Sequence, residues 1–344
     1  MRNIIITDSS LRDGNHSVKH TISLDSISRY CQFAEKAGIP IVEVGHGNGL
    51  AASSLLVGRC VNTDEEMLST AKKYLKNSKL GIHMIPGIAT LDHAKKAIDL
   101  GVDVVRVATH CTEATLSKSH IEALAKANVE VFGVLMMSAL ISPEELVEQA
   151  KIMTDYGAKA IIIMDSTGSY LPVDVQTRIT LLKNNLTVDI GFHAHNNLGC
   201  AVANSLIAAQ FGAKYIDGCI RGFGAGAGNA PLELLIPVLQ QSGFNLNVNF
   251  HETIKEADTV MDYLIPTELT VTPINVLTGL TKLFSGFEKP IINASKLYGV
   301  EYSSLIFELG NKKLVAGQED LILEVAQKLK NENINNRSKR IFRF

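Results

Sequence analysis

The sequence carries little net charge and no long hydrophobic run. Its 33 Lys and Arg residues nearly balance 35 Asp and Glu residues, which gives a formal net charge of −2. No broad electrostatic field therefore favours nucleic acid or an anionic membrane. The longest apolar stretch, 131–141, is too short to cross a bilayer and is interrupted by Ser138. We expect neither a nucleic-acid partner nor a membrane anchor.

Cysteines are few, and no two of them form a C-x-x-C pair. The five are scattered along the chain and odd in number, so we expect buried, reduced thiols in a cytoplasmic protein. The N-terminus opens on a polar-flanked strand instead of an apolar signal segment, and no secretory signal is expected. The basic segment 335–340 is expected to be a solvated or frayed end.

What the chain does have is a regular alternation of apolar runs and amphipathic segments. The apolar runs predict strands at 4–6, 41–44, 80–85, 104–108, 129–136, 160–164, 188–192 and 215–220. The amphipathic segments predict helices at 26–36, 64–76, 91–99, 117–127, 143–156, 173–184 and 200–211. Nearly continuous apolar strands that alternate with helices indicate a parallel sheet covered on both sides.

This pattern predicts a TIM (β/α)8 barrel, because eight strands are the number that closes one. A doubly wound open sheet is the structural alternative. Polar residues such as His46, Asp165 and His195 follow the strand ends, and these ends converge on one face only in a closed barrel. We assign residues 1–249 to the barrel as the catalytic domain.

After residue 249 the alternation stops, and a mostly helical module is expected over 250–330. Helices are predicted at 251–264, 273–284, 290–297, 303–309 and 318–328. We expect this module to cover part of the barrel mouth, bind a partner or form a subunit interface in a homo-oligomer. Residues 331–344 are assigned to a basic tail.

Two short segments suggest a metal site. Successive strand residues point to opposite faces, so His193 and His195 face the same way. Asp13 follows the first strand, at the same barrel end. One carboxylate and two imidazoles would form an open-sided site that suits Mn²⁺, Co²⁺ or Zn²⁺ better than Mg²⁺. The alternative is two hydrogen-bonded histidines in a polar layer.

Arg12 and His16 flank Asp13. Adjacent residues that leave a strand are expected to point in different directions, with Asp13 on the metal and Arg12 beside the substrate. The alternative is an ion pair between the two in a loop. A guanidinium can stabilise the negative charge of an enolate oxygen, and His16 has the pKa range of a base near neutrality.

A glycine-rich loop, 222–228, follows the last predicted strand. It could cradle a phosphate, but the sequence contexts of the known phosphate-binding loops are absent. Close approach of its backbone to the metal site is the other interpretation, with Asn229 supporting a metal ligand.

These motifs together resemble the 4-hydroxy-2-oxovalerate aldolases, class II pyruvate aldolases of the DRE-TIM metallolyase group. The resemblance runs from about Ile6 to Leu329. It is carried by Leu11-Arg-Asp-Gly-Asn-His16, Glu43-Val-Gly-His-Gly-Asn-Gly49, Arg106-Val-Ala-Thr-His-Cys-Thr-Glu113, Gly191-Phe-His-Ala-His-Asn-Asn-Leu198, Gly224-Ala-Gly-Ala-Gly-Asn-Ala-Pro-Leu-Glu233 and Leu314-Val-Ala-Gly-Gln-Glu-Asp320.

The resemblance implies a reversible cleavage of a 4-hydroxy-2-oxoacid to pyruvate and an aldehyde. It implies a divalent cation, Mn²⁺ first and Co²⁺ or Mg²⁺ next, on Asp13, His193 and His195. It further implies His16 as the base and Arg12 as the stabiliser of the transition state.

The resemblance also assigns a substrate contact and a partner. Ser166 matches a residue that holds the pyruvyl carboxylate. The helical module of the family docks an acylating aldehyde dehydrogenase that consumes the aldehyde, so such a partner is expected here.

Two positions depart from the family pattern. Phe284 replaces a tyrosine beside the substrate, and His83 stands in a strand exit that is usually leucine-rich and lines the aldehyde pocket. We expect a more polar aldehyde than acetaldehyde. The alternative for His83 is a core histidine bonded to a backbone carbonyl.

Two other functions have weaker support from the sequence. Relatives that condense acyl-CoA with 2-oxoacids carry Glu and Gln where this chain has Asn15 and His16, and Gly-Glu-Arg where it has 224–226. These differences favour aldol over Claisen chemistry. An aldolase-like scaffold for a dehydrogenase is disfavoured, because a scaffold has no physical need for Arg12, Asp13, His16 and both histidines of the H-x-H pair.

Overall fold

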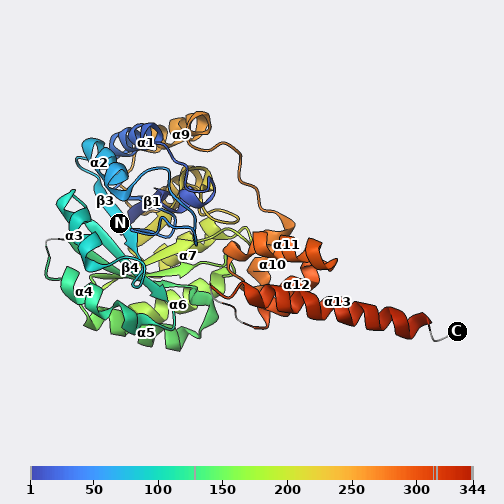
Figure 1. Ribbon diagram of the computed structural model, residues 1–344. Helices are drawn as coiled ribbons and strands as arrows, with labels where there is room; N and C mark the ends of the chain where they lie inside the picture. The colour runs from blue at the N-terminus through green and yellow to red at the C-terminus, as the bar shows by residue number, and fades with distance from the viewer. Residues whose placement is uncertain (1, 128, 313, 315–316, 342–344) are drawn as a thin grey trace.

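The computed structural model describes residues 2–127, 129–312, 314 and 317–341, with side chains as far as Glu332. Eight parallel strands form a closed barrel in chain order, with β8 paired to β1 (Figure 1). The strands are β1 (Ile5–Leu11), β2 (Ile41–Val44), β3 (Lys79–Met84), β4 (Val104–His110), β5 (Glu130–Met136), β6 (Ala160–Asp165), β7 (Asp189–Ala194) and β8 (Tyr215–Gly218). The predicted TIM barrel is confirmed.

The helices that cover the barrel begin and end at strong sequence signals. They are α1 (Leu24–Ala37), α2 (Asp64–Tyr74), α3 (Leu91–Asp99), α4 (Lys118–Leu124), α5 (Pro143–Asp155), α6 (Pro172–Asn185), α7 (Ala201–Phe211) and α8 (Leu232–Gln241). Thr63 and Ser142 each close a capping box with a glutamate three residues later. Gly38 ends α1 with φ at 72°, a left-handed conformation that glycine adopts without strain.

Within the barrel, two elements differ most from the sequence prediction. β1 extends to Leu11 because its polar residues find partners inside the fold: Tyr30 donates to Asp8 at 2.6 Å, and Ser9 donates to Glu43 at 2.8 Å. Helix α8 was not predicted. It contains Pro237 and follows directly on the glycine-rich loop.

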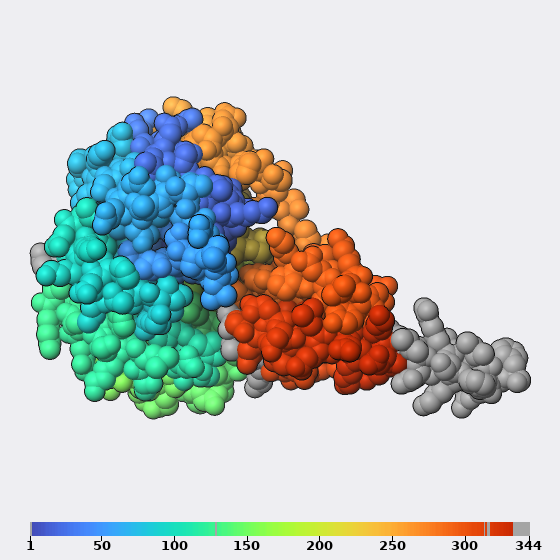
Figure 2. Space-filling view, in the orientation of Figure 1, coloured from blue at the N-terminus to red at the C-terminus, as the bar shows by residue number. Residues whose placement is uncertain are grey.

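The helical module has its own core. Its helices are α10 (Pro273–Thr281), α11 (Glu288–Tyr298), α12 (Tyr302–Gly310) and α13 (Asp320–Ile341). Buried side chains such as Phe287, Ile291 and Leu305 form a second hydrophobic cluster separate from the barrel core. Figure 2 shows the module as a lobe beside the barrel.

The boundary at 249/250 falls inside packed structure. Helix α9 (Phe250–Thr259) contacts α1 and α8, and its Ala257 lies in the barrel core. Val260 and Ile265 belong to the same core. We therefore place the division after Ile265, because α9 buries its apolar face on the barrel.

The segment assigned to a basic tail is largely helical. α13 runs from Asp320 to Ile341, so the helix continues through 335–340. Residues 342–344 lie outside the described residues. No helix in the described part of the chain is long and apolar enough to cross a membrane.

The module is docked on loops at the carboxyl ends of the strands. Asn197, after β7, donates to the Asn275 carbonyl at 3.2 Å. Lys282 donates to the Ala139 carbonyl, after β5, at 3.2 Å. The module therefore packs against the barrel face where TIM-barrel enzymes carry their active sites.

Candidate metal centre at the barrel mouth

One carboxylate and two imidazoles meet at this face. Asp13 opens the short 3-10 helix η1 (Asp13–His16) directly after β1, and His193 and His195 lie at the end of β7. One potential ligand atom from each lies within 4.8 Å of the others, and all three residues are buried. The three side chains are therefore close enough to share a single ion.

The histidine nitrogens fit a metal. Nε2 of His193 and Nδ1 of His195 are buried and have no hydrogen-bond partner among the described residues. A buried polar atom without a partner is costly, and a bound cation would satisfy both. Burial lowers the pKa of His195 to about 4 although Asp13 opposes the shift, so this imidazole is neutral at pH 7, as a metal ligand must be.

Asp13 is held ionised in the same place. Burial alone would raise its pKa, but Arg12, followed by His195 and His193, keeps the pKa well below its usual range. Nη1 of Arg12 lies 2.6 Å from Oδ1 of Asp13. The expectation that the two side chains point apart was wrong, since the turn into η1 directs both into the barrel mouth.

The glycine-rich loop closes on the other oxygen of Asp13. Oδ2 accepts hydrogen bonds from Asn229 at 2.8 Å and from the Ala225 amide at 3.1 Å. A Cβ on Gly224 would lie 2.7 Å from that oxygen and from Asn229 Nδ2. Of the two interpretations of this loop, the structure shows the close approach of its backbone to Asp13, one of the three candidate ligands.

A network of buried charged side chains connects to the candidate ligands inside the barrel. Glu43, on β2, accepts from Arg12 Nε at 3.0 Å and lies 3.4 Å from Nη1 of Arg106, on β4. Asp217, on β8, lies 2.6 Å from Nη2 of Arg106 and 3.0 Å from Nδ1 of His193. Arg12 and His193 are thus joined through three further side chains.

Sequence reasoning gave no role to Glu43, Arg106 and Asp217. The available signal was a charged residue among mostly apolar neighbours in each of three strands, β2, β4 and β8. Nearly complete burial of charge is rare unless the charge is paired. That signal could mark the residues, but only the strand register shows which of them pair.

His16 ends η1 at the rim of the same mouth, where it is half-buried. Gly47 approaches its ring so closely that a Cβ there would overlap it. His20 lies edge-on to His16 at 5.2 Å between ring centroids and stacks on His46 at 3.6 Å. Burial lowers the pKa of His16 below 6.5 although Asp13 opposes the shift, so the imidazole is a free base at neutral pH.

The remaining predicted residues lie at different depths. Ser166 follows β6, and its oxygen accepts a hydrogen bond from the Met137 amide at 2.9 Å. His83, on β3, is buried with Nδ1 3.7 Å from a Glu43 oxygen, so its neighbour is a carboxylate and not a backbone carbonyl. Phe284 is half-buried and packs against the barrel core and the module core.

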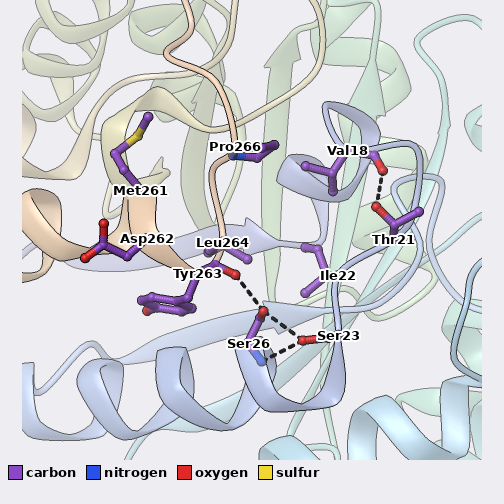
Figure 3. A pocket seen from close by; sticks show the side chains of 10 residues that line it. All are labelled: Val18, Thr21, Ile22, Ser23, Ser26, Met261, Asp262, Tyr263, Leu264 and Pro266. Atoms are coloured by element: carbon purple, nitrogen blue, oxygen red, sulfur yellow. Dashed lines mark hydrogen bonds between the residues drawn. The ribbon is translucent and has the colours of Figure 1, made fainter.

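A separate groove of about 370 Å³ lies outside this centre. Figure 3 shows it between Val18–Ser26 and Met261–Pro266, where Ser26 donates to the Tyr263 carbonyl at 2.8 Å. The metal-ligand candidates do not line it. It belongs to the junction between α1 and the segment that leads to the helical module.

Comparison with known proteins defines the class of this enzyme. Residues 3–260 match the HMGL-like family, and residues 269–331 match the DmpG-like communication domain. The carboxyl transferase domain of Rhizobium etli pyruvate carboxylase, solved with pyruvate, has the same fold, with a TM-score of 0.79 at 16% identity over 96% of this chain and 61% of that one.

Two curated relatives specify the family further. The chain is 51% identical to a 4-hydroxy-2-oxovalerate aldolase of Spirochaeta aurantia, covering 95% of this chain and 96% of the relative. It is 47% identical to the enzyme of that name from Pectobacterium atrosepticum, covering 97% and 98%. The chain therefore belongs to the 4-hydroxy-2-oxovalerate aldolase family and is a carbon–carbon lyase.

Replacement of Gly224 by alanine tests the close approach of the loop. The new methyl group would displace Asp13 or Asn229, so we expect Mn²⁺ to bind about 10-fold or more weakly in Gly224→Ala, a loss typical of disturbed supporting contacts. Isothermal titration with Mn²⁺ measures the change. Gly243→Ala is the control. Its new methyl group would meet no atom within 4 Å, so any effect comes from the left-handed backbone at that glycine and not from a close contact. Equal Mn²⁺ affinity in wild type and Gly224→Ala would contradict the assignment.

Proposed function

We propose that this chain is a metal-dependent aldolase that reversibly cleaves a 4-hydroxy-2-oxoacid to pyruvate and an aldehyde. The observation that carries the proposal is the buried group of Asp13, His193 and His195, with two imidazole nitrogens that lack partners. Family membership supports the same reaction, because the relatives are named for it.

Asp13, His193 and His195 would hold the cation, and we propose Mn²⁺, with Co²⁺ or Mg²⁺ as substitutes. When bound, it supplies a Lewis acid that polarises the substrate oxygens. The chemistry of the donors supports Mn²⁺ over Mg²⁺, because two of the three are imidazoles.

The protein's own side chains would divide the remaining work. Arg12, held by Glu43, stabilises the negative charge that develops on the oxygen of the pyruvate enolate. Ser166 binds the substrate carboxylate through its hydroxyl group. His16 removes the proton from the 4-hydroxyl as the carbon–carbon bond breaks, and its lowered pKa keeps it ready to accept that proton.

The role of His16 has a definite pH dependence. With saturating Mn²⁺, kcat/KM for 4-hydroxy-2-oxopentanoate should fall toward acid with an apparent pKa below 6.5, since protonated His16 cannot accept a proton. His16→Ala should lower kcat by about 10²–10⁴-fold. Coupled detection of pyruvate gives the rates, and His251→Ala, an exposed histidine on α9, is the control. An acid limb centred above pH 7, or near wild-type turnover in His16→Ala, would contradict this role.

We further propose that His83 and Phe284 shape the aldehyde site and favour a polar aldehyde. His83 is buried, with Nδ1 lacking a hydrogen-bond partner among the described residues, and its ring would accept or donate a bond to a substrate hydroxyl. Burial lowers the pKa of His83 to about 4, so it would act as a neutral group.

Replacement of His83 by leucine tests this preference. His83→Leu should shift the ratio of kcat/KM for glycolaldehyde over acetaldehyde, in the condensation with pyruvate, by about 10-fold or more toward acetaldehyde, because a polar pocket rejects an analogue that lacks its hydroxyl. His120→Leu, a histidine on α4, is the control. A wild-type enzyme that already prefers acetaldehyde clearly would refute the proposal.

We also propose that the helical module binds an acylating aldehyde dehydrogenase. The match to a DmpG-like communication domain supports a protein partner, as does the exposed apolar surface of the module. Among the described residues of the module, the most exposed large hydrophobic side chains are Leu280 on α10, Leu297 on α11 and Phe307 on α12, which are 60%, 70% and 52% exposed. The free thiols of all five cysteines support the cytoplasmic location that we propose.

Charge placed on this surface tests the partner. Leu280→Glu with Phe307→Glu should abolish co-elution with the acylating aldehyde dehydrogenase of the same organism but leave aldol cleavage unchanged. Leu171→Glu, an exposed leucine on the barrel, is the control. Light scattering of the aldolase alone shows whether the same change dissociates a homo-oligomer instead, and retention of the dehydrogenase by the double variant would exclude this surface.

A further inference from the structure

Arg106 is a fully buried cation to which the proposed reaction assigns no task. It lies on β4 with 1% of its surface exposed, paired in register with His83 on β3 and Phe132 on β5. Its guanidinium faces two carboxylates from the strands that flank β1, Asp217 on β8 at 2.6 Å and Glu43 on β2 at 3.4 Å. Neither carboxylate is among the three candidate metal ligands.

On one side, Arg106 is connected through Asp217 to the candidate metal ligand His193. The same oxygen of Asp217 that meets Arg106 lies 3.0 Å from Nδ1 of His193. Asp217 forms an ion pair with Arg106 at 2.6 Å, so its carboxylate oxygen is an acceptor for Nδ1 of His193. Nδ1 of His193 must then carry the proton. The lone pair is left on Nε2, the buried nitrogen that lacks a partner among the described residues.

On the other side, Arg106 is connected through Glu43 to Arg12, the residue proposed to contact the substrate. Oε2 of Glu43 lies near both guanidinium groups, 3.0 Å from Arg12 Nε and 3.4 Å from Arg106 Nη1. Ser9 also donates to this oxygen, at 2.8 Å. The carboxylate of Glu43 is therefore fixed between the two arginines, and it fixes the orientation of Arg12 in turn.

The charges in the lumen require a second cation. Asp13, Glu43 and Asp217 are buried carboxylates, and Arg12 already pairs with the first two. Without Arg106, Asp217 would have no arginine partner. The free energy of an unpaired buried carboxylate is unfavourable, so the side chain would turn toward water or its surroundings would rearrange. Only a planar, forked guanidinium meets two carboxylates at once, which a lysine ammonium cannot do in the same way.

We infer that Arg106 is a positioning residue that sets both the metal affinity, through Asp217 and His193, and the orientation of Arg12, through Glu43. This inference rests on the proposed function, since it assumes that Asp13, His193 and His195 hold a divalent cation. Arg106 would act on the reaction without touching the substrate.

The test is a titration of the full chain with Mn²⁺, read from the electron paramagnetic resonance signal of the free ion in the absence of substrate. Arg106→Met and Asp217→Asn should each weaken Mn²⁺ binding about 10–100-fold, the range for residues that support metal ligands. Arg106→Lys should recover only part of the loss. Arg178→Met is the matched control, because Arg178 is a largely buried arginine on α6 outside the network.

Turnover at saturating Mn²⁺ separates the two sides. Arg106→Met should also lower kcat, through Glu43 and Arg12, whereas Asp217→Asn should recover most of its kcat once the metal is loaded. A general loss of structure would lower the melting temperature and reduce kcat in both variants alike. The melting temperature of each variant is therefore measured by circular dichroism.

The outcomes are distinguishable from those that test the proposed function. A wild-type chain that binds no Mn²⁺ would refute both the metal site and this inference. Wild-type binding that is unchanged in folded Arg106→Met would overturn the inference alone. If Arg106→Met does not fold, Arg106→Lys decides: Mn²⁺ affinity and kcat equal to those of wild type would overturn it, and a combined loss of both supports it.

Discussion

Closure of the barrel between β1 and β8 is the constraint on which the rest of the structure depends. The register pairs Ile5 with Tyr215 and Asp8 with Gly218. Because β7 lies directly beyond β8, closure brings Asp13 to within ligand distance of two histidines some 180 residues away in sequence. An open sheet would leave these groups at separate positions along an edge.

The closed lumen also explains the arrangement of charge. Inside it, carboxylates and guanidinium groups alternate from Asp13 through Arg12, Glu43 and Arg106 to Asp217. Buried ion pairs contribute little net stability, because desolvation offsets their attraction. The selection of so many in one place is better explained by function: they hold Arg12 and His193 in fixed orientations, and a fixed orientation is what catalysis by preorganised charge needs.

The barrel, and the facing of His193 and His195 toward one side, could be predicted from sequence because both depend on local pattern. Strand and helix periodicity gave the eightfold repeat, and the H-x-H spacing placed two imidazoles on one side. The relation of Arg12 to Asp13 was wrongly predicted, since the turn into η1 redirects both side chains. The extension of β1 was missed because its polar residues are satisfied only by distant partners such as Tyr30.

The pairing of Asp217 with His193 and Arg106 was beyond prediction from one sequence. It depends on the register of three strands, and a shift by one residue would turn a side chain to the opposite face. The position of α9 was missed for a similar reason. Its helical pattern was visible, but nothing local shows that it packs on α1 and α8 and not on the module.

The most direct test of this account is a crystal structure of the chain grown with Mn²⁺, with diffraction recorded at a wavelength where manganese scatters anomalously. The account predicts one strong anomalous peak at the barrel mouth, about 2.0–2.3 Å from an oxygen of Asp13 and from one nitrogen each of His193 and His195. A mouth without a peak at saturating Mn²⁺, or manganese bound only to surface carboxylates, would contradict it.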